Sequence, residues 1–234
     1  MDTALILRKA RPSSSGAHSV TIRNTNTGVL TTSRMIISEG GTFQLTEIPG
    51  VMGSHPSVDL FLHDPAGAKT TGSPVNVIDG VEVSCVDVAV PMVIIRAADV
   101  GKTSYESVAE LTADGMFLQR LKSICDLSVR YFTPQTVHAS RAVSGGCCLA
   151  AATLIPGSVA HGIAPKDAQK DETELRVGIE NPAGILGATV VAHTEADEIS
   201  IRSAAYQRSA QVLLAGYVPL YRASTELQQA LASN

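Results

Sequence analysis

Tryptophan is absent from this 234-residue sequence, and aromatic residues make up only 4% of it. Proteins that stack nucleic-acid bases or hold peptides in aromatic grooves depend on such rings, so both classes are disfavoured. The sequence also lacks an excess of basic residues, because 18 lysines and arginines against 22 acidic residues give a net charge of −4. Phosphate binding requires a basic surface, and we therefore expect no nucleic-acid partner.

Clustered metal ligands and paired cysteines are also missing. The four cysteines show no Cys-x-x-Cys spacing and no signal peptide is recognisable ahead of them, which predicts a reduced, cytoplasmic chain: Cys85, Cys125, Cys147 and Cys148. The histidines are scattered, without the close pairs of a zinc site: His18, His55, His63, His138, His161 and His193. We expect no metal, no cofactor and no membrane partner.

The amino-acid composition is apolar and typical of a globular protein. Hydrophobic residues make up 44% and charged residues 17% of the chain, which excludes a disordered protein. The length fits one large or two small domains. The segment Lys69–Asp79 turns polar and rich in proline and glycine, so it is the best candidate for a crossing between domains.

The most informative stretch is Val81–Asp99, in which two runs of β-branched residues flank a short junction. β-Branching favours strands, and the run is too short for a membrane helix, so we predict a pair of core strands. Pairing is expected to break around Pro91, which lacks an N–H donor. Two interpretations stay open for Cys85 and Asp87: a structural role in the core and turn, or a reactive site.

Further strands and helices are predicted along the chain. Expected strands cover His18–Arg23, Met35–Ser38, Ser57–Leu62, Glu174–Ile179, Thr189–His193, Glu198–Arg202 and Tyr217–Tyr221. Apolar residues at three- and four-residue spacing predict a helix over Ser104–Phe132. A second helix is expected over Ala204–Ala215, ending at Gly216, and the C-terminal tail is polar and helical.

A second informative stretch begins at Ser144, where Ser-Gly-Gly leads into an alanine-rich apolar segment. We predict a buried helix over Gly146–Ile155, with small residues on all sides so that a sheet can wrap around it. Its free N–H groups would form an anion site suited to a carboxylate. An ordinary serine-capped core helix explains the same residues equally well.

Several of these segments together resemble the PrpF family, which includes 4-oxalomesaconate tautomerase and methylitaconate and aconitate isomerases. The resemblance runs from about His18 to Val218 and is carried, in the family's order, by Asn24–Gly28, Ile48–Gly50, Phe61–Gly67, Asp79–Val93, His138 with Ala142–Gly145, Ile179–Gly184, and Arg208–Ala210 before Leu213 and Gly216. No one of these motifs is diagnostic, and it is their order that makes the match specific.

The resemblance implies an α+β, diaminopimelate-epimerase-like fold, with curved, mostly antiparallel sheets that each wrap around a central helix. Its expected divisions are an unassigned segment 1–17, a remnant of the first domain 18–78, a second domain 79–222 and a polar tail 223–234. The implied chemistry is a cofactor-free 1,3-allylic proton shift on an unsaturated di- or tricarboxylate. In that scheme Ser144, Gly145, Gly146 and His138 hold a carboxylate, and Val90, Pro91 and Met92 form the cleft wall.

The chain departs from the family where its catalytic lysine and cysteine are expected. It contains neither Cys-Gly-Asn nor Gly-Gly-Thr-Ser-Lys-Gly, Ala139 replaces an arginine, and Gln211 replaces a basic residue. Catalytic residues therefore stay unassigned, and Cys85 is one candidate for a replacement acid. Three hypotheses follow: an isomerase, a truncated and silent homologue that binds a ligand or a partner chain, and a plain structural β-module. Loss of part of the core also predicts self-association as a homo-oligomer.

Overall fold

A computed structural model describes residues 15–67, 71–126, 143–161, 163, 173–181, 184–195, 198–213, 216 and 224–232. The strands are β1 (Gly16–Arg23), β2 (Leu30–Ile37), β3 (Leu45–Glu47), β4 (Ser54–His63), β5 (Asn76–Ile78), β6 (Val81–Val88), β7 (Val90–Ile95), β8 (Thr173–Asn181), β9 (Gly184–Glu195) and β10 (Glu198–Ser209). The helices are α2 (Val108–Ala113), α3 (Gly115–Asp126), α4 (Val143–Ala152) and α5 (Thr225–Ala232), with a 3-10 helix η1 (Ala97–Val100).

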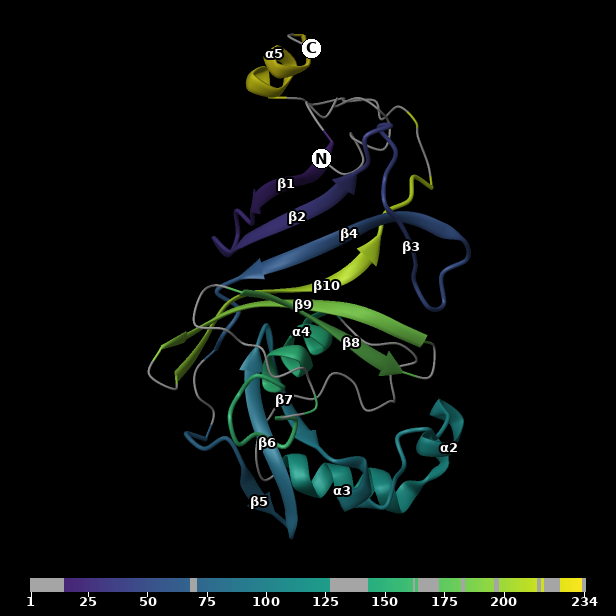
Figure 1. Cartoon of the computed structure of the whole chain (residues 1–234), viewed down its shortest axis with the longest axis vertical. Coiled ribbons are helices and arrows are strands. Elements are labelled where there is room, and N and C mark those ends of the chain that lie inside the picture. Colours follow the sequence, from purple (N-terminus) through teal and green to yellow (C-terminus); the bar gives the residue numbers. More distant parts are fainter. Residues whose placement is uncertain are drawn as a thin grey trace.

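The strands form two sheets, and the described pairing is antiparallel throughout (Figure 1). The larger sheet has the order β1-β2-β4-β10-β9-β8, with β3 paired to β4, and the smaller has the order β5-β6-β7. The protein is therefore α+β, as the resemblance implied. Strands β4 and β10 pair directly, so segments from opposite ends of the chain share one sheet.

The larger sheet is bent. Arg34 on β2 donates to Glu174 on β8, with 3.0 Å between Nη1 and Oε2, although β4, β10 and β9 lie between these strands in the sheet order. A flat sheet would separate β2 and β8 by about 19 Å, at roughly 4.8 Å per strand, which is further than these two side chains can span. Arg34 also pairs with Asp59 on β4, at 3.2 Å between Nη2 and Oδ2.

The predicted strand pair over Val81–Asp99 is confirmed as β6 and β7. Ala89, with a left-handed φ of 63°, is the one residue between them. The expected break at Pro91 is wrong, because the ladder continues through Pro91, which lies opposite Asp87. Strand β7 pairs only with β6 among the described residues, and a proline fits an edge strand where its nitrogen need not donate to the ladder.

The alanine-rich helix is confirmed as α4, but it covers Val143–Ala152 and so begins and ends three residues earlier than predicted. Seven of its ten residues are buried. It packs against β9 and β10 on one side and against β6 and β7 on the other (Figure 1). Small side chains allow this close contact with two sheets, and α4 therefore forms the centre of the main hydrophobic core.

The smaller sheet is covered on both faces. Because side chains alternate along a strand, Val86 and Val88 pack with the core around α4, whereas Val81 and Val83 pack with Ile124 of α3. The predicted helix over Ser104–Phe132 is two helices, α2 and α3, separated by Asp114. Residues 127–132 of that prediction lie outside the described part of the chain.

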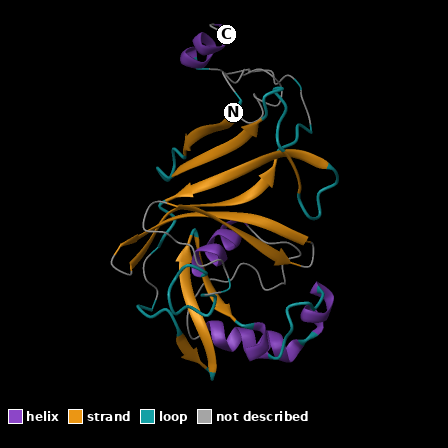
Figure 2. Ribbon diagram, viewed as in Figure 1, coloured by secondary structure: helices purple, strands orange, loops and turns teal. Residues whose placement is uncertain are grey.

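The predicted helix over Ala204–Ala215 is wrong, since β10 continues to Ser209. Alanine favours helices in isolation, but Ala204, Ala205 and Tyr206 are at most 1% exposed in the middle of the larger sheet, between β4 and β9. Pairing on both edges overrides the local preference. The helical tail is confirmed as α5, which Figure 2 shows beyond β1 and β2. The strand expected over Tyr217–Tyr221 lies outside the described residues.

Candidate functional site

The first turn of α4 is the candidate anion site. Val143 and Ser144 are half-buried there, whereas Gly145 and Gly146 are buried. The first N–H groups of a helix have no partner within it, and the helix dipole places positive charge at this end. The structure thus places Ser144, Gly145 and Gly146 inside the first turn rather than ahead of it. His138 lies outside the described residues.

Gly146 has a packing role that the sequence did not indicate. A β-carbon at this position would lie 2.6 Å from Cε2 of Tyr206, a distance that real side chains do not tolerate. Tyr206 on β10 is fully buried. Glycine is therefore required here so that the ring can lie directly against the helix.

Arg208 extends this contact toward the surface. It is half-buried two residues after Tyr206 and therefore lies on the same face of β10, the face that α4 covers. Its guanidinium carbon lies 5.0 Å from the centre of the Tyr206 ring. From the sequence alone, Arg208 was assigned only a place in a motif. A charged residue two positions after the buried run Ser203–Tyr206 was the signal available, but it became meaningful only once this run was known to be a strand.

The two cysteines of α4 are not reactive thiols. Burial raises the pKa of Cys147 to about 11, and the nearby charge of Arg208 offsets part of that rise. Burial likewise raises the pKa of Cys148 to about 12. Both thiols are protonated at neutral pH and cannot act as thiolate bases or nucleophiles. Cys148 instead donates a weak hydrogen bond to the carbonyl oxygen of Val86, at 3.4 Å.

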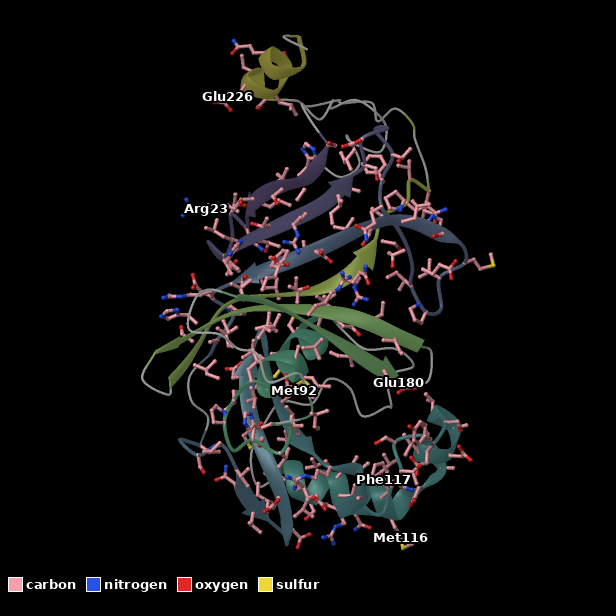
Figure 3. The ribbon with its side chains drawn as sticks, in the orientation of Figure 1. Arg23, Met92, Met116, Phe117, Glu180 and Glu226 are labelled. Carbon is pink, nitrogen blue, oxygen red and sulfur yellow. The ribbon has the colours of Figure 1, made fainter. Side chains whose placement is uncertain are left out.

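The predicted wall residues divide between the two faces of β7. Val90 and Met92 are half-buried and pack with the core around α4, which also includes Val143 (Figure 3). Pro91 alternates with them and lies on the opposite face. The structure thus brings Val90 and Met92, but not Pro91, to the side of the smaller sheet that α4 covers.

Cys85 and Asp87 belong to that opposite face as well. Cys85 packs with the cluster of Val81, Val83 and Ile124, which favours its structural interpretation. The Asp87 carboxylate lies against Gly67, where a β-carbon would come within 1.9 Å of Oδ2. The backbone carbonyl of Asp87 also accepts from the Gly67 N–H at 2.8 Å. Asp87 therefore fixes the segment that leads out of β4.

Metal-ligand clusters and membrane-spanning helices can both be sought in the described part of the chain. Among these residues, no three histidine, cysteine or acidic side chains come together as metal ligands. No helix within the same ranges is long and apolar enough to cross a membrane.

Comparison with models of known families shows to which family the chain belongs. The family model described as "PrpF protein" matches residues 1–125 and 123–221. The chain belongs to the PrpF family. This PrpF chain is 31% identical over 216 residues to a protein of Pseudomonas putida (strain KT2440) named 4-oxalomesaconate tautomerase, with 76% of the chain and 59% of the relative covered.

Other relatives agree on the family. The PrpF chain is 25% identical over 264 residues to 3-methylitaconate isomerase of Eubacterium barkeri, covering 87% of the chain and 67% of that protein. A crystal structure of methylitaconate-delta-isomerase superposes with a TM-score of 0.65 at 21% identity, over 89% of the chain and 68% of its own. The chain spans less than three fifths of the length of the 4-oxalomesaconate tautomerase and of the first relatives it matches.

Proposed function

We propose that this PrpF chain contributes to a cofactor-free 1,3-allylic proton shift on an unsaturated di- or tricarboxylate of the 4-oxalomesaconate kind. The observation that carries the proposal is its membership of a family whose matched relatives are named as isomerases and tautomerases of such acids. We further propose the diaminopimelate-epimerase-like fold, the domain limits at residues 17, 78 and 222, and a cytoplasmic location.

The proposed reaction breaks one C–H bond beside a carboxylate or carbonyl group. The electron pair moves into the conjugated system as a dienolate, the double bond shifts, and a proton returns to the carbon two positions away. No electrons are gained or lost overall, so the step requires no redox partner. The developing anion has to be stabilised by hydrogen-bond donors and positive charge.

The binding part of this scheme is proposed for residues at the start of α4 and on β7. The amide groups of Ser144, Gly145 and Gly146 in the first turn of α4 are proposed to hold one carboxylate, together with His138, which precedes them in the sequence. Val90 and Met92, on the side of β7 that α4 covers, are proposed to line the ligand site, whereas Pro91 on the opposite face is not. Because the Cys147 and Cys148 thiols stay protonated at neutral pH, neither is proposed as the base.

The test is hydrogen exchange in deuterated water. The purified chain is incubated in turn with 4-oxalomesaconate, aconitate and methylitaconate, and incorporation of deuterium at the allylic carbons is followed by NMR. The proposal predicts exchange with at least one acid. Absence of exchange with all three would contradict it and favour a homologue that binds a ligand or partner without catalysis.

Matched serine variants locate the activity. Ser144→Phe fills the first turn of α4 and is expected to abolish exchange, because a bulky ring blocks access to the amide groups. Ser200→Phe places the same ring at an exposed position on β10 and is expected to leave exchange unchanged. Equal loss in both variants would point to general damage to the fold rather than to a site at α4.

A further inference from the structure

The edge strands of the two sheets differ in how well they are protected against pairing with another chain. Within the described part of the chain, β8 carries the charged side chains of Glu174, Arg176 and Glu180. Strand β7 contains Pro91, and β3 and β5 have only three residues each. Charges, prolines and short length are the features by which proteins normally protect such edges. These four strands are therefore poor templates for an additional strand.

Strand β1 lacks this protection along most of its length. It has eight residues, of which six are exposed, and Arg23 at its last position is its only lysine, arginine or acidic residue. It pairs only with β2 in the part of the chain that the structure describes. The backbone N–H and C=O groups that point away from β2 form a row that another β-strand can pair with. The kind of partner that fits this edge is thus an extended strand.

The side chains of β1 fit a second β1 in the antiparallel direction. A twofold axis normal to the sheet and through Val20 keeps every side chain on its own face of the sheet. Val20 then lies against Val20 of the second copy, and Ile22, which is 49% exposed, lies against His18 on the same face. On the other face Thr21 lies against Ser19. This pairing covers the apolar side chains of the strand and opposes no like charges.

The one charged end of β1 favours this direction and this register. In the antiparallel arrangement Arg23 lies opposite the small side chain of Ala17, and the two Arg23 residues are about 20 Å apart, at roughly 3.4 Å for each of six residues. A parallel arrangement would place the two guanidinium groups side by side, which is unfavourable. An axis through Ser19 would place Ile22 opposite Gly16, which has no side chain to cover it.

We propose that β1 pairs antiparallel with β1 of a second copy of this chain, across a twofold axis through Val20. The contact joins two larger sheets into one and uses the same surface of both copies, so it closes as a dimer and does not extend into a fibre. It is independent of the proposed function, because β2 and β4 separate β1 from β10, the nearest strand of the sheet order that α4 packs against (Figure 1).

Disulfide formation between introduced cysteines tests this pairing. Two cysteines form a disulfide only when their Cα atoms lie within about 7 Å. The variants are oxidised at equal concentration, and linked dimer is quantified by non-reducing gel electrophoresis. Val20→Cys, at the axis, is expected to shift from monomer to linked dimer. Ala17→Cys and Arg23→Cys are each expected to stay monomeric alone and to form a linked dimer when they are mixed.

The wild type and Val77→Cys are the controls, and both are expected to stay monomeric on the gel. The wild type retains the four native cysteines, and Val77 is 70% exposed on the edge strand β5. Absence of linked dimer both in Val20→Cys and in the mixture would overturn the proposal. Equal linkage of Arg23→Cys alone and in the mixture would indicate parallel pairing or aggregation, and equal linkage of Val77→Cys would show that the contact is not specific to β1.

Circular dichroism checks that the variants fold. Val20 is half-buried, whereas Ala17 and Arg23 are exposed. If Val20→Cys does not fold, the mixture of Ala17→Cys and Arg23→Cys decides, and its failure to form a linked dimer refutes the pairing.

Discussion

Some single residues in this chain are constrained because a side chain of one element fills the space beside the backbone of another. Gly146 is the clearest case, because the ring of Tyr206 occupies the space that a β-carbon would need. Neither partner can move freely, since both are buried. A substitution at Gly146 therefore tests whether α4 and β10 are packed as described.

Gly146→Ala should destabilise the protein. We expect a loss of about 1–2 kcal/mol in the free energy of unfolding, because overpacking against Tyr206 outweighs the better helix propensity of alanine. Urea denaturation provides the measurement. Gly115→Ala in α3 is the matched control, since a β-carbon there has open space and should be neutral or slightly stabilising. Equal stability of the two variants would show that the ring does not lie where the structure places it.

The carboxylate of Glu174 should make the stability of the protein depend on pH. Hydrogen bonding to Arg34 is the main cause that holds the pKa of Glu174 below its usual value. A lowered pKa in the folded state stabilises the protein above the pKa of the unfolded state, and this contribution disappears as the pH falls through the folded value. The side chain is 45% exposed, so the contribution is expected to be at most about 1 kcal/mol.

Thermal unfolding of Glu174→Gln between neutral pH and pH ~3 measures this contribution. The variant should be less stable than the wild type at neutral pH, and the difference should shrink toward acid pH. Glu180→Gln changes an exposed carboxylate at the other end of β8 and is expected to follow the wild type (Figure 3). If the stability difference between Glu174→Gln and the wild type stays constant with pH, the ion pair with Arg34 is not its cause.

At the scale of elements, the sequence predicted the strands and helices whose residues agree with their surroundings. The β-branched run of β6 and β7 and the small-residue run of α4 are examples, because local preference and burial favour the same structure there. Strand β10 was predicted only in part, since Ala204 and Ala205 favour a helix until β4 and β9 pair on either side. The contact of Arg208 with the Tyr206 ring also depends on that strand and could not be predicted from the sequence.

Helix α2 is an element that is stabilised mainly by its N-terminal cap. Ser107 accepts from the Glu110 N–H, and Glu110 accepts in return from the Ser107 N–H, which forms a capping box. None of the residues of α2 is buried. Its stability therefore rests on this cap more than on packing.

Ser107→Ala should loosen α2 without unfolding the rest of the protein. We expect a local loss of about 1 kcal/mol, seen as faster amide hydrogen exchange over residues 108–113. Exchange in α4 should be unchanged. Thr112→Ala is the control, because its hydroxyl only donates to a carbonyl within the same helix, that of Val108. Faster exchange throughout the chain would contradict a purely local role of the cap.

At the scale of the whole molecule, β1 forms an exposed edge of the larger sheet within the described part of the chain. Most residues of β1 are exposed, and β1 pairs only with β2 among the described residues. It contains no proline, lysine or acidic residue, and its one arginine, Arg23, lies at its last position, so it has few of the features that usually prevent edge strands from pairing with other chains. Exposed apolar side chains lie nearby on β1, β2 and the turn between them: Ile22, Val29, Leu30 and Ile36.

We therefore expect the protein to self-associate. Sedimentation velocity over a range of concentrations should show a species larger than the monomer, and Ile22→Lys should shift the distribution toward monomer. Val77→Lys, at an exposed position on the edge strand β5, is the control and should not shift it. A monodisperse monomer at all concentrations would contradict this expectation.

The direct pairing of β4 with β10 also bears on how the chain is made. Val58 and Arg208 are register partners although they lie 150 positions apart in the sequence (208 − 58). During synthesis, β4 leaves the ribosome long before its neighbour exists, and contacts between distant segments form slowly. The edge of β4 that pairs with β10 therefore stays open in the nascent chain until residues 198–209 have been synthesised.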